Sequence, residues 1–270
     1  MPELPEVETT LRGISRYVIG NRVTDVIVYQ RQLRWPVSRH LGRSLRNQQI
    51  ISVKRRAKYL LFETAAGHLI VHLGMSGSLR IVVGETEAKK HDHVDFVLGG
   101  KILRFHDPRR FGCILWTRQD PLRHKLLQAL GPEPFSDAFN GHYLYKRAAT
   151  RKVNVKSFIM NSGIVAGVGN IYANEALFAS GIHPQRAANR ISQSRYEMLA
   201  DSIKEVLDKA IHSGGTTLRD FLRENGKPGY FAQQLNVYNR SGEPCPVCRK
   251  PIQVRMLGQR SSFFCSRCQH

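Results

Sequence analysis

Two Cys-x-x-Cys pairs near the C-terminus place the strongest constraint on how this chain can fold. Cys245 and Cys248 form the first pair, and Cys265 and Cys268 form the second after 16 intervening residues. This spacing is typical of a zinc ribbon, in which two knuckles close one tetrahedral site of four thiolates. Such a site has no open position, so we expect one structural Zn²⁺ that takes no part in chemistry. The alternative, four buried cysteines without a metal, fits the spacing less well.

Positive charge is spread along the whole chain. Lys and Arg total 41 against 21 Asp and Glu, which gives a formal net charge of +20. A polyanion is therefore the expected partner. No apolar run approaches the roughly 20 residues of a membrane-spanning helix, and the N-terminus lacks the features of a secretory signal. We expect a soluble, cytoplasmic protein without membrane contact, and the isolated Cys113 suits a reducing compartment.

The apolar pattern divides the chain into three expected domains and predicts an α+β fold. Residues 1–131 begin with a helical period and continue in short runs that predict an antiparallel β-sandwich or barrel: VTDVIVY, YLLFE, HLIVHLG, LRIVVG, VDFVLGG and ILRFHD. The GPEP turn then marks a boundary, and helical periodicity returns in residues 132–236. Residues 237–270 contain the cysteine pairs.

The N-terminus has the composition of a reactive site. Removal of the initiator methionine would expose the secondary amine of Pro2. An α-amino group has a pKa of roughly 8 against about 10.4 for lysine, so more of it is unprotonated at neutral pH. A secondary amine that attacks a sugar C1′ gives an iminium, which draws electrons from neighbouring bonds. Glu3 and Glu6 lie close enough to move protons, although acids are common in the first turn of any helix.

Six motifs, together with the cysteine pairs, resemble those of the bacterial formamidopyrimidine-DNA glycosylases. They are MPELPEVE at the start, RRAKYLL at 55–61, HLGMSGSLR at 72–80, DPRRFG at 107–112, GVGNIYANEALF at 167–178 and KPGYFAQ at 227–233. The resemblance implies an N-terminal β-sandwich with a leading helix, a helix-two-turn-helix domain and a zinc finger. It also implies a monomer that removes oxidised purines from damaged double-stranded DNA and cleaves the strand by β- and δ-elimination.

The resemblance assigns catalytic roles to four residues. Pro2 becomes the Schiff-base nucleophile and Glu3 the acid that assists opening of the sugar ring. Lys58 becomes the proton donor for β-elimination, and the two arginines of its motif are expected to lower its pKa. Arg260 becomes the finger residue used in δ-elimination. Without the resemblance, Lys58 would be interpreted as a phosphate contact and Arg260 as a solvated side chain.

Base excision from a duplex requires the damaged nucleotide to leave the stack, and the space that it vacates must be filled. Met75, Arg109 and Phe111 resemble the residues that fill this space in the family. Phe111 can wedge into the stack, Met75 is flexible filler, and Arg109 can bind the unpaired partner base. For Met75 and Phe111 the competing interpretation is ordinary core packing.

The resemblance also implies phosphate contacts. They are assigned to His91, to Arg151 and to Asn170, which follows two glycines at the expected start of a helix. A loop that covers the damaged base is expected between about residues 216 and 230, but its base contacts are not readable from the sequence.

Two other functions compete with excision of oxidised purines. An enzyme of the endonuclease VIII type shares the proline chemistry and prefers oxidised pyrimidines. Leu4, the three space-filling residues and KPGYF favour the purine-directed branch instead. A non-catalytic zinc-ribbon protein that binds DNA would explain the charge and the cysteines equally well.

Overall fold

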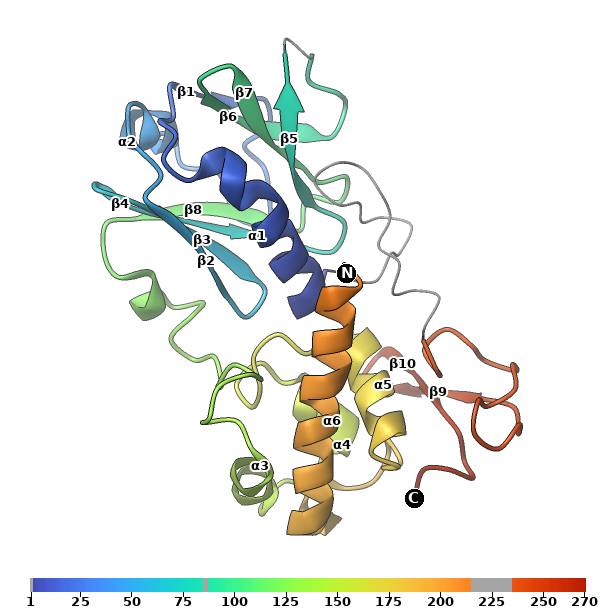
Figure 1. The fold of residues 1–270 in the computed structure, drawn as a ribbon. Helices are drawn as coiled ribbons and strands as arrows, with labels where there is room; N and C mark the ends of the chain where they lie inside the picture. Colours follow the sequence, from blue (N-terminus) through green and yellow to red (C-terminus); the bar gives the residue numbers. More distant parts are fainter. Residues whose placement is uncertain (1, 85–86, 215–234) are drawn as a thin grey trace. The chain divides into compact units, whose positions relative to one another are not determined.

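The computed structural model describes residues 2–84, 87–214 and 235–270 (Figure 1). Met1, the expected base-covering loop at 216–230 and the KPGYFAQ motif lie outside these described residues. The described chain forms two compact units. The first extends to Gln128, and the second contains Ala129–His212 and the C-terminal residues to His270.

Helix α1 (Leu4–Val18) opens the first unit. Val7, Ile14 and Val18 recur at helical spacing and are fully buried, so they form the apolar face that packs on β2, β3 and β5 (Figure 1). The carboxylate of Glu6 accepts the backbone N–H of Glu3 at 2.8 Å and thereby closes the first turn. The leading helix predicted from the sequence is confirmed.

Two antiparallel four-stranded sheets form the rest of the first unit. The first sheet has the order β1 (Asp25–Val28), β6 (Asp92–Leu98), β7 (Lys101–His106), β5 (Ser78–Val83). The second has the order β2 (Ser52–Arg56), β3 (Tyr59–Thr64), β4 (Gly67–His72), β8 (Cys113–Thr117). Both sheets and α1 contribute to one core, with Phe96 and Phe105 from the first sheet and Phe62 and Val71 from the second. The predicted β-sandwich is confirmed. Short helices α2 (Leu41–Leu45) and η1 (Pro121–Arg123) complete the unit.

Strand β2 is absent from the runs that the apolar pattern identifies. It carries Lys54, Arg55 and Arg56 in succession, and it lies at the edge of its sheet. Charged residues are common on edge strands because they discourage pairing with another chain. Because three of its five residues are basic, β2 has too few apolar residues to be recognised from a hydrophobic pattern.

A buried ion pair joins the two central strands of the first sheet. The carboxylate of Asp95, which is fully buried, accepts Nε and Nη2 of Arg104 at 2.8 and 2.7 Å. The hydroxyl of Tyr29 donates to the same carboxylate at 3.0 Å. A bidentate pair of this kind compensates the cost of burying two charges.

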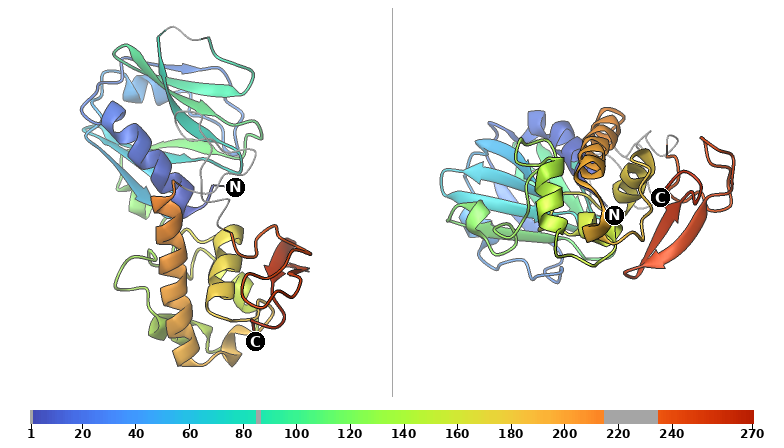
Figure 2. Two further views of the ribbon diagram at one scale, coloured as in Figure 1. Left: turned by 45° about the vertical axis from the view of Figure 1, so that its right-hand side comes forward. Right: turned by 90° about the horizontal axis from the view of Figure 1, so that it is seen from below.

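The second unit is helical and carries a two-stranded hairpin. Its helices are α3 (Gly141–Ala148), α4 (Val155–Met160), α5 (Asn170–Ala179), η2 (Ala188–Arg190) and α6 (Gln193–His212). Helix α6 packs against α3 and α5 (Figure 2). Strands β9 (Gln253–Leu257) and β10 (Arg260–Phe264) pair antiparallel, and β10 lies against α5. Within the described residues, no helix has the length and apolarity needed to cross a membrane.

Glu175 on α5 fixes the chain that leads into the hairpin. Its buried carboxylate accepts the backbone N–H groups of Asn236, Val237 and Tyr238 at 2.8–2.9 Å and the side-chain amide of Asn236 at 3.1 Å. Asn174, one residue earlier, accepts the N–H of Phe263 on β10 at 2.8 Å. Two successive residues of α5 therefore hold the chain that leads to the hairpin and the second strand of the hairpin.

We expect Glu175→Gln to destabilise the second unit by about 1–3 kcal/mol, because an amide NH₂ group would face N–H donors in a buried place. Chemical denaturation followed by far-ultraviolet circular dichroism, which is sensitive to the helices of the second unit, measures this loss. Glu197→Gln on α6, an exposed acid bonded to Gln193, is the matched control and should change stability by less than about 0.5 kcal/mol. Equal unfolding curves for the two variants would contradict the anchoring role of Glu175.

Candidate functional site

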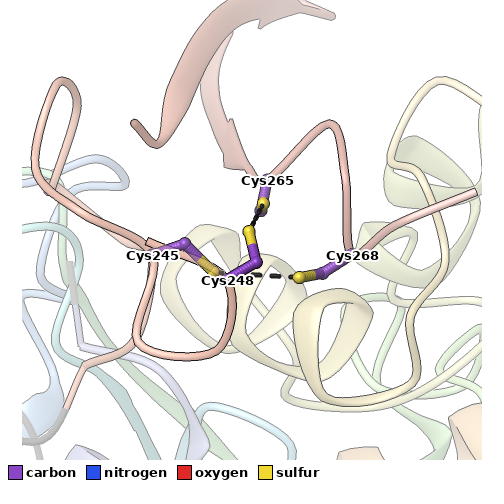
Figure 3. Close-up of side chains that lie close together, drawn as sticks. All are labelled: Cys245, Cys248, Cys265 and Cys268. Carbon is purple, nitrogen blue, oxygen red and sulfur yellow. Dashed lines mark hydrogen bonds between the residues drawn. The ribbon is translucent and has the colours of Figure 1, made fainter. Parts of the chain in front are cut away.

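The four C-terminal cysteines converge on one point (Figure 3). Their sulfur atoms all lie within 4.8 Å of one another, and the Cys245–Cys268 and Cys248–Cys265 sulfur pairs are 3.9 and 3.4 Å apart. A tetrahedral zinc ion with Zn–S bonds of about 2.3 Å requires sulfur separations of about 3.8 Å. The donor set and its spacing therefore fit one closed, structural Zn²⁺.

The predicted nucleophile and its acid lie at the start of α1. Pro2 is buried, and Glu3, the residue that caps the helix, is only 1% exposed. Glu6 is 2% exposed, and its bond to the Glu3 N–H fixes the backbone between Pro2 and the helix. The sequence left the role of Glu6 open, and the structure identifies it as a positioning group. The spacing of a capping box, with an acid three residues after the cap, is the signal that indicates this role.

Lys58 lies in the two-residue turn between β2 and β3 and is half-buried. Ala57 beside it adopts a positive φ of 53°, as tight hairpins require. Arg55 donates to the carbonyl of Ala57 at 3.1 Å and to the carboxylate of Glu8 on α1 at 2.9 Å. The turn that carries Lys58 is thus tied to helix α1, which Glu3 caps.

His72, at the end of β4, is a further group of this region that sequence reasoning did not single out. Burial lowers its pKa to about 4, and the positive charges of Lys58 and Arg34 act in the same direction. Its Nδ1 accepts the N–H of Gly74 at 2.9 Å, and its ring packs against Tyr59 at 4.7 Å between centroids. His72 is therefore neutral at physiological pH and joins the Lys58 turn to the turn that contains Met75.

The space-filling residues occupy two neighbouring connections of the first unit. Met75 is half-buried in the turn between β4 and β5, and Arg109 and Phe111 are exposed between β7 and β8. Phe111 is 43% exposed, so the competing interpretation as core packing does not hold for it. The guanidinium of Arg109 lies 4.8 Å from the centre of the Phe111 ring. This contact keeps an exposed aromatic ring and a cation together.

His91 precedes β6 and is half-buried against His106, with ring centroids 5.9 Å apart at an edge-to-face angle. His106 is bonded to the buried carboxylate of Asp92 at 2.8 Å. Burial lowers the pKa of His106, and the carboxylate opposes that shift. His91, the predicted phosphate contact, therefore packs against a histidine that a hydrogen bond to Asp92 holds in place.

The second unit brings Asn170 and Arg260 together. Asn170 begins α5, and its amide nitrogen donates to the carbonyl of Ser261 at 3.2 Å. The ammonium of the buried Lys156 donates to the same carbonyl at 2.8 Å. Arg260, the preceding residue, is exposed after a turn in which Gly258 and Gln259 both have positive φ.

One oxygen of Asn170 is buried and has no hydrogen-bond partner among the described residues. A buried, unsatisfied acceptor is costly, and a water or a ligand donor beside it would remove that cost. Arg151, the third predicted phosphate contact, is exposed after α3. The predicted residues therefore fall into two sets: Pro2, Glu3, Lys58, Met75, His91, Arg109 and Phe111 in the first unit, and Arg151, Asn170, Arg260 and the four cysteines in the second.

Removal of the metal should unfold the hairpin that carries Arg260 and thereby weaken DNA binding. We expect Cys268→Ser to contain less than about a tenth of the zinc of the wild type, because a tetrahedral site that loses a thiolate binds zinc far more weakly. Metal content by atomic absorption and DNA binding by anisotropy measure the two effects. Cys113→Ala, which removes the buried thiol outside the cluster, should keep its zinc. Full zinc content in Cys268→Ser would contradict the assignment.

Three family descriptions match consecutive parts of the chain. Residues 1–114 match the formamidopyrimidine-DNA glycosylase N-terminal domain, and residues 130–222 match the formamidopyrimidine-DNA glycosylase H2TH domain. Residues 242–270 match a zinc finger found in FPG and IleRS. The predicted helix-two-turn-helix domain and the structural zinc finger are thereby confirmed.

Relatives match over the full length. The chain is 56% identical over 271 residues to the formamidopyrimidine-DNA glycosylase of Nitrosococcus oceani and 58% identical over 270 residues to that of Methylococcus capsulatus, with 100% of each chain covered.

Solved structures agree with these relatives. The MutM (FPG) protein of Thermus thermophilus superposes with a TM-score of 0.89 at 37% identity, covering 99% of this chain and 98% of that one. The wild-type Lactococcus lactis Fpg (MutM) in complex with DNA that contains N7-benzyl-Fapy-dG gives 0.91 at 33% identity with 100% of both chains covered. The agreement extends from the N-terminal helix to the zinc finger, and the chain belongs to the formamidopyrimidine-DNA glycosylase family.

Proposed function

We propose that this chain excises oxidised purines, namely 8-oxoguanine and formamidopyrimidines, from damaged double-stranded DNA and then cleaves the strand by β- and δ-elimination. The observation that carries this proposal is the full-length match to formamidopyrimidine-DNA glycosylases. Lactococcus lactis relatives are complexes with a Fapy-dG derivative and with abasic DNA, which supports both a glycosylase and a lyase activity. The net charge of +20 suits a polyanionic substrate.

The first chemical step uses the two residues at the start of α1. The lone pair of the Pro2 nitrogen attacks C1′ of the damaged nucleoside, and the electrons of the glycosidic bond leave with the base. The proton that the nitrogen then loses balances the proton that the departing base takes up. Glu3 then donates a proton to O4′ as the C1′–O4′ bond opens, and the nitrogen becomes an iminium. The buried carboxyl of Glu3 and the Glu6 bond that fixes the preceding backbone support this arrangement.

The iminium then accepts the electrons released in strand cleavage. Loss of a C2′ proton breaks the C3′–O bond in β-elimination, where Lys58 supplies the proton that the reaction requires. Loss of a C4′ proton breaks the C5′–O bond in δ-elimination, and Arg260 stabilises the departing phosphate. Addition of water to the remaining iminium releases the sugar fragment as an aldehyde and frees Pro2. The zinc ion stabilises the finger that presents Arg260 and takes no part in these steps.

The remaining candidate residues bind the bent and opened duplex. Met75, Arg109 and Phe111 fill the space left by the damaged nucleotide, and the exposure of the Phe111 ring supports this role. His91, Arg151 and Asn170 bind phosphates, and the unpaired buried oxygen of Asn170 suits a bridging water or a ligand donor.

We also propose the finer organisation that the sequence suggested. The chain has three domains at 1–131, 132–236 and 237–270, which the family matches at 1–114, 130–222 and 242–270 support. It acts as a monomer in the bacterial cytoplasm.

Borohydride trapping tests the nucleophile directly. We expect the enzyme to form a stable adduct with a duplex that contains 8-oxoguanine, and mass spectrometry of the adduct should place the sugar on Pro2. Pro2→Gly should retain weak trapping because its N-terminal amine stays free, whereas a short N-terminal extension should abolish it. The same extension at the C-terminus is the control. An adduct on a lysine side chain would contradict the assignment of Pro2 as the nucleophile. The absence of any adduct would favour the non-catalytic DNA-binding alternative.

Lesion preference separates the purine-directed enzyme from the endonuclease VIII type. We expect 8-oxoguanine opposite cytosine to be excised at least about tenfold faster than thymine glycol in an otherwise identical duplex, a difference that corresponds to about 1.4 kcal/mol in the barrier. Single-turnover kinetics with both duplexes give this ratio. Faster release of thymine glycol would reverse the assignment.

A further inference from the structure

Asp107 is a buried acid that the mechanism above does not use. It follows β7 directly and is 0% exposed. Its charge is not compensated by an ion pair with any of the described residues. A buried carboxylate without a cationic partner must be satisfied by hydrogen-bond donors, so the identity of those donors shows what it holds in place.

The donors come from the two connections that carry the space-filling residues. One carboxylate oxygen accepts the hydroxyl of Ser76 at 3.2 Å and the backbone N–H of Arg109 at 3.3 Å. The other accepts the backbone N–H of Gly112 at 2.8 Å. Ser76 follows Met75 in the β4–β5 turn. In the β7–β8 connection, Arg109 lies two residues before Phe111 and Gly112 lies directly after it.

The backbones of the two connections are also in direct contact. A Cβ atom on Gly74, which has a φ of +68°, would lie 2.4 Å from the nitrogen of Gly112 and 2.6 Å from the carbonyl carbon of Phe111. A Cβ atom on Gly112 would lie 2.6 Å from the carbonyl oxygen of His72. Neither contact can be relieved by a side-chain rotation, because the atoms met are backbone atoms.

We propose that Asp107 is a positioning residue that fixes Met75, Arg109 and Phe111 in one relative arrangement, so that the three side chains enter an opened base pair together. This inference rests on the proposed function, because it concerns how the duplex is opened for excision. Asp107 itself contacts neither the damaged base nor the sugar. Its carboxylate keeps the two connections together through N–H and O–H bonds, and Phe111 stays exposed because its flanking backbone is held from beneath.

Asp107→Asn tests this role with little change in volume. The asparagine amide would oppose one of the three donors, and an unsatisfied buried donor is expected to lower the single-turnover excision of 8-oxoguanine from duplex DNA about tenfold. A single-stranded oligonucleotide with an abasic site has no base pair to open, so borohydride trapping on it should match the wild type within about twofold.

A double-mutant cycle with Phe111→Ala distinguishes positioning from general destabilisation. If Asp107 acts through Phe111 and its neighbours, Asp107→Asn should cost no more than about threefold in duplex excision in the Phe111→Ala background. A full tenfold loss in that background would overturn the proposal. Asp95→Asn is the matched control: it removes an equally buried charge from the sheet, and its effect on excision should be the same with and without Phe111.

Ser76→Ala provides a second route if Asp107→Asn does not fold. It removes one of the three donors to Asp107 and places no new polar group beside the carboxylate. We expect it to lower duplex excision about threefold in the wild-type background and by less in the Phe111→Ala background. Additive losses would again overturn the proposal. Wild-type enzyme is measured in parallel, because failure of the wild type to trap would contradict the proposed function, whereas a trapping wild type with an additive cycle would contradict only the role of Asp107.

Discussion

Buried carboxylates need N–H or O–H donors around them, and this need fixes three segments that carry or adjoin candidate residues. Glu6 binds the backbone behind Pro2, Asp107 binds the connections that carry Met75 and Phe111, and Glu175 binds the chain that enters the finger. The chain has 21 acidic residues against 41 basic ones. Several of its few acids are buried and hold backbone segments in place, whereas the phosphate contacts that we propose draw on the more numerous basic residues.

The sequence predicts the elements whose signals are local. Two cysteine pairs indicate the zinc site, helical spacing from Val7 to Val18 indicates α1, and alternating apolar runs indicate the sandwich. Strand β2 was missed because its basic residues mask it. The contacts of Asp107 and Glu175 were missed for a different reason. Glu175 accepts backbone amides about 60 residues away, and backbone amides leave no trace in a residue pattern. Asp107 accepts two nearby backbone amides and the hydroxyl of Ser76, which is distant in the sequence. The roles of individual site residues and the three domain boundaries stay predictions.

Two candidate residues combine an exposed side chain with a fixed neighbouring backbone. Phe111 presents its ring to solvent, and Arg260 presents its guanidinium, yet the residue beside each is held by buried groups: Gly112 by Asp107, and Ser261 by Lys156 and Asn170. An exposed apolar ring costs free energy in the unbound protein, and the entry into a base stack that we propose for Phe111 would recover that cost. Ordering the backbone in advance also reduces the entropy lost on binding.

The environment of Cys113 affects how readily its thiol is oxidised. Cys113 is buried in β8, and burial raises the pKa of its thiol to about 11. Oxidants react with the thiolate far faster than with the protonated thiol. The other four sulfurs converge at the zinc site. The thiol outside the zinc site is therefore a poor target for the oxidants that produce oxidised purines.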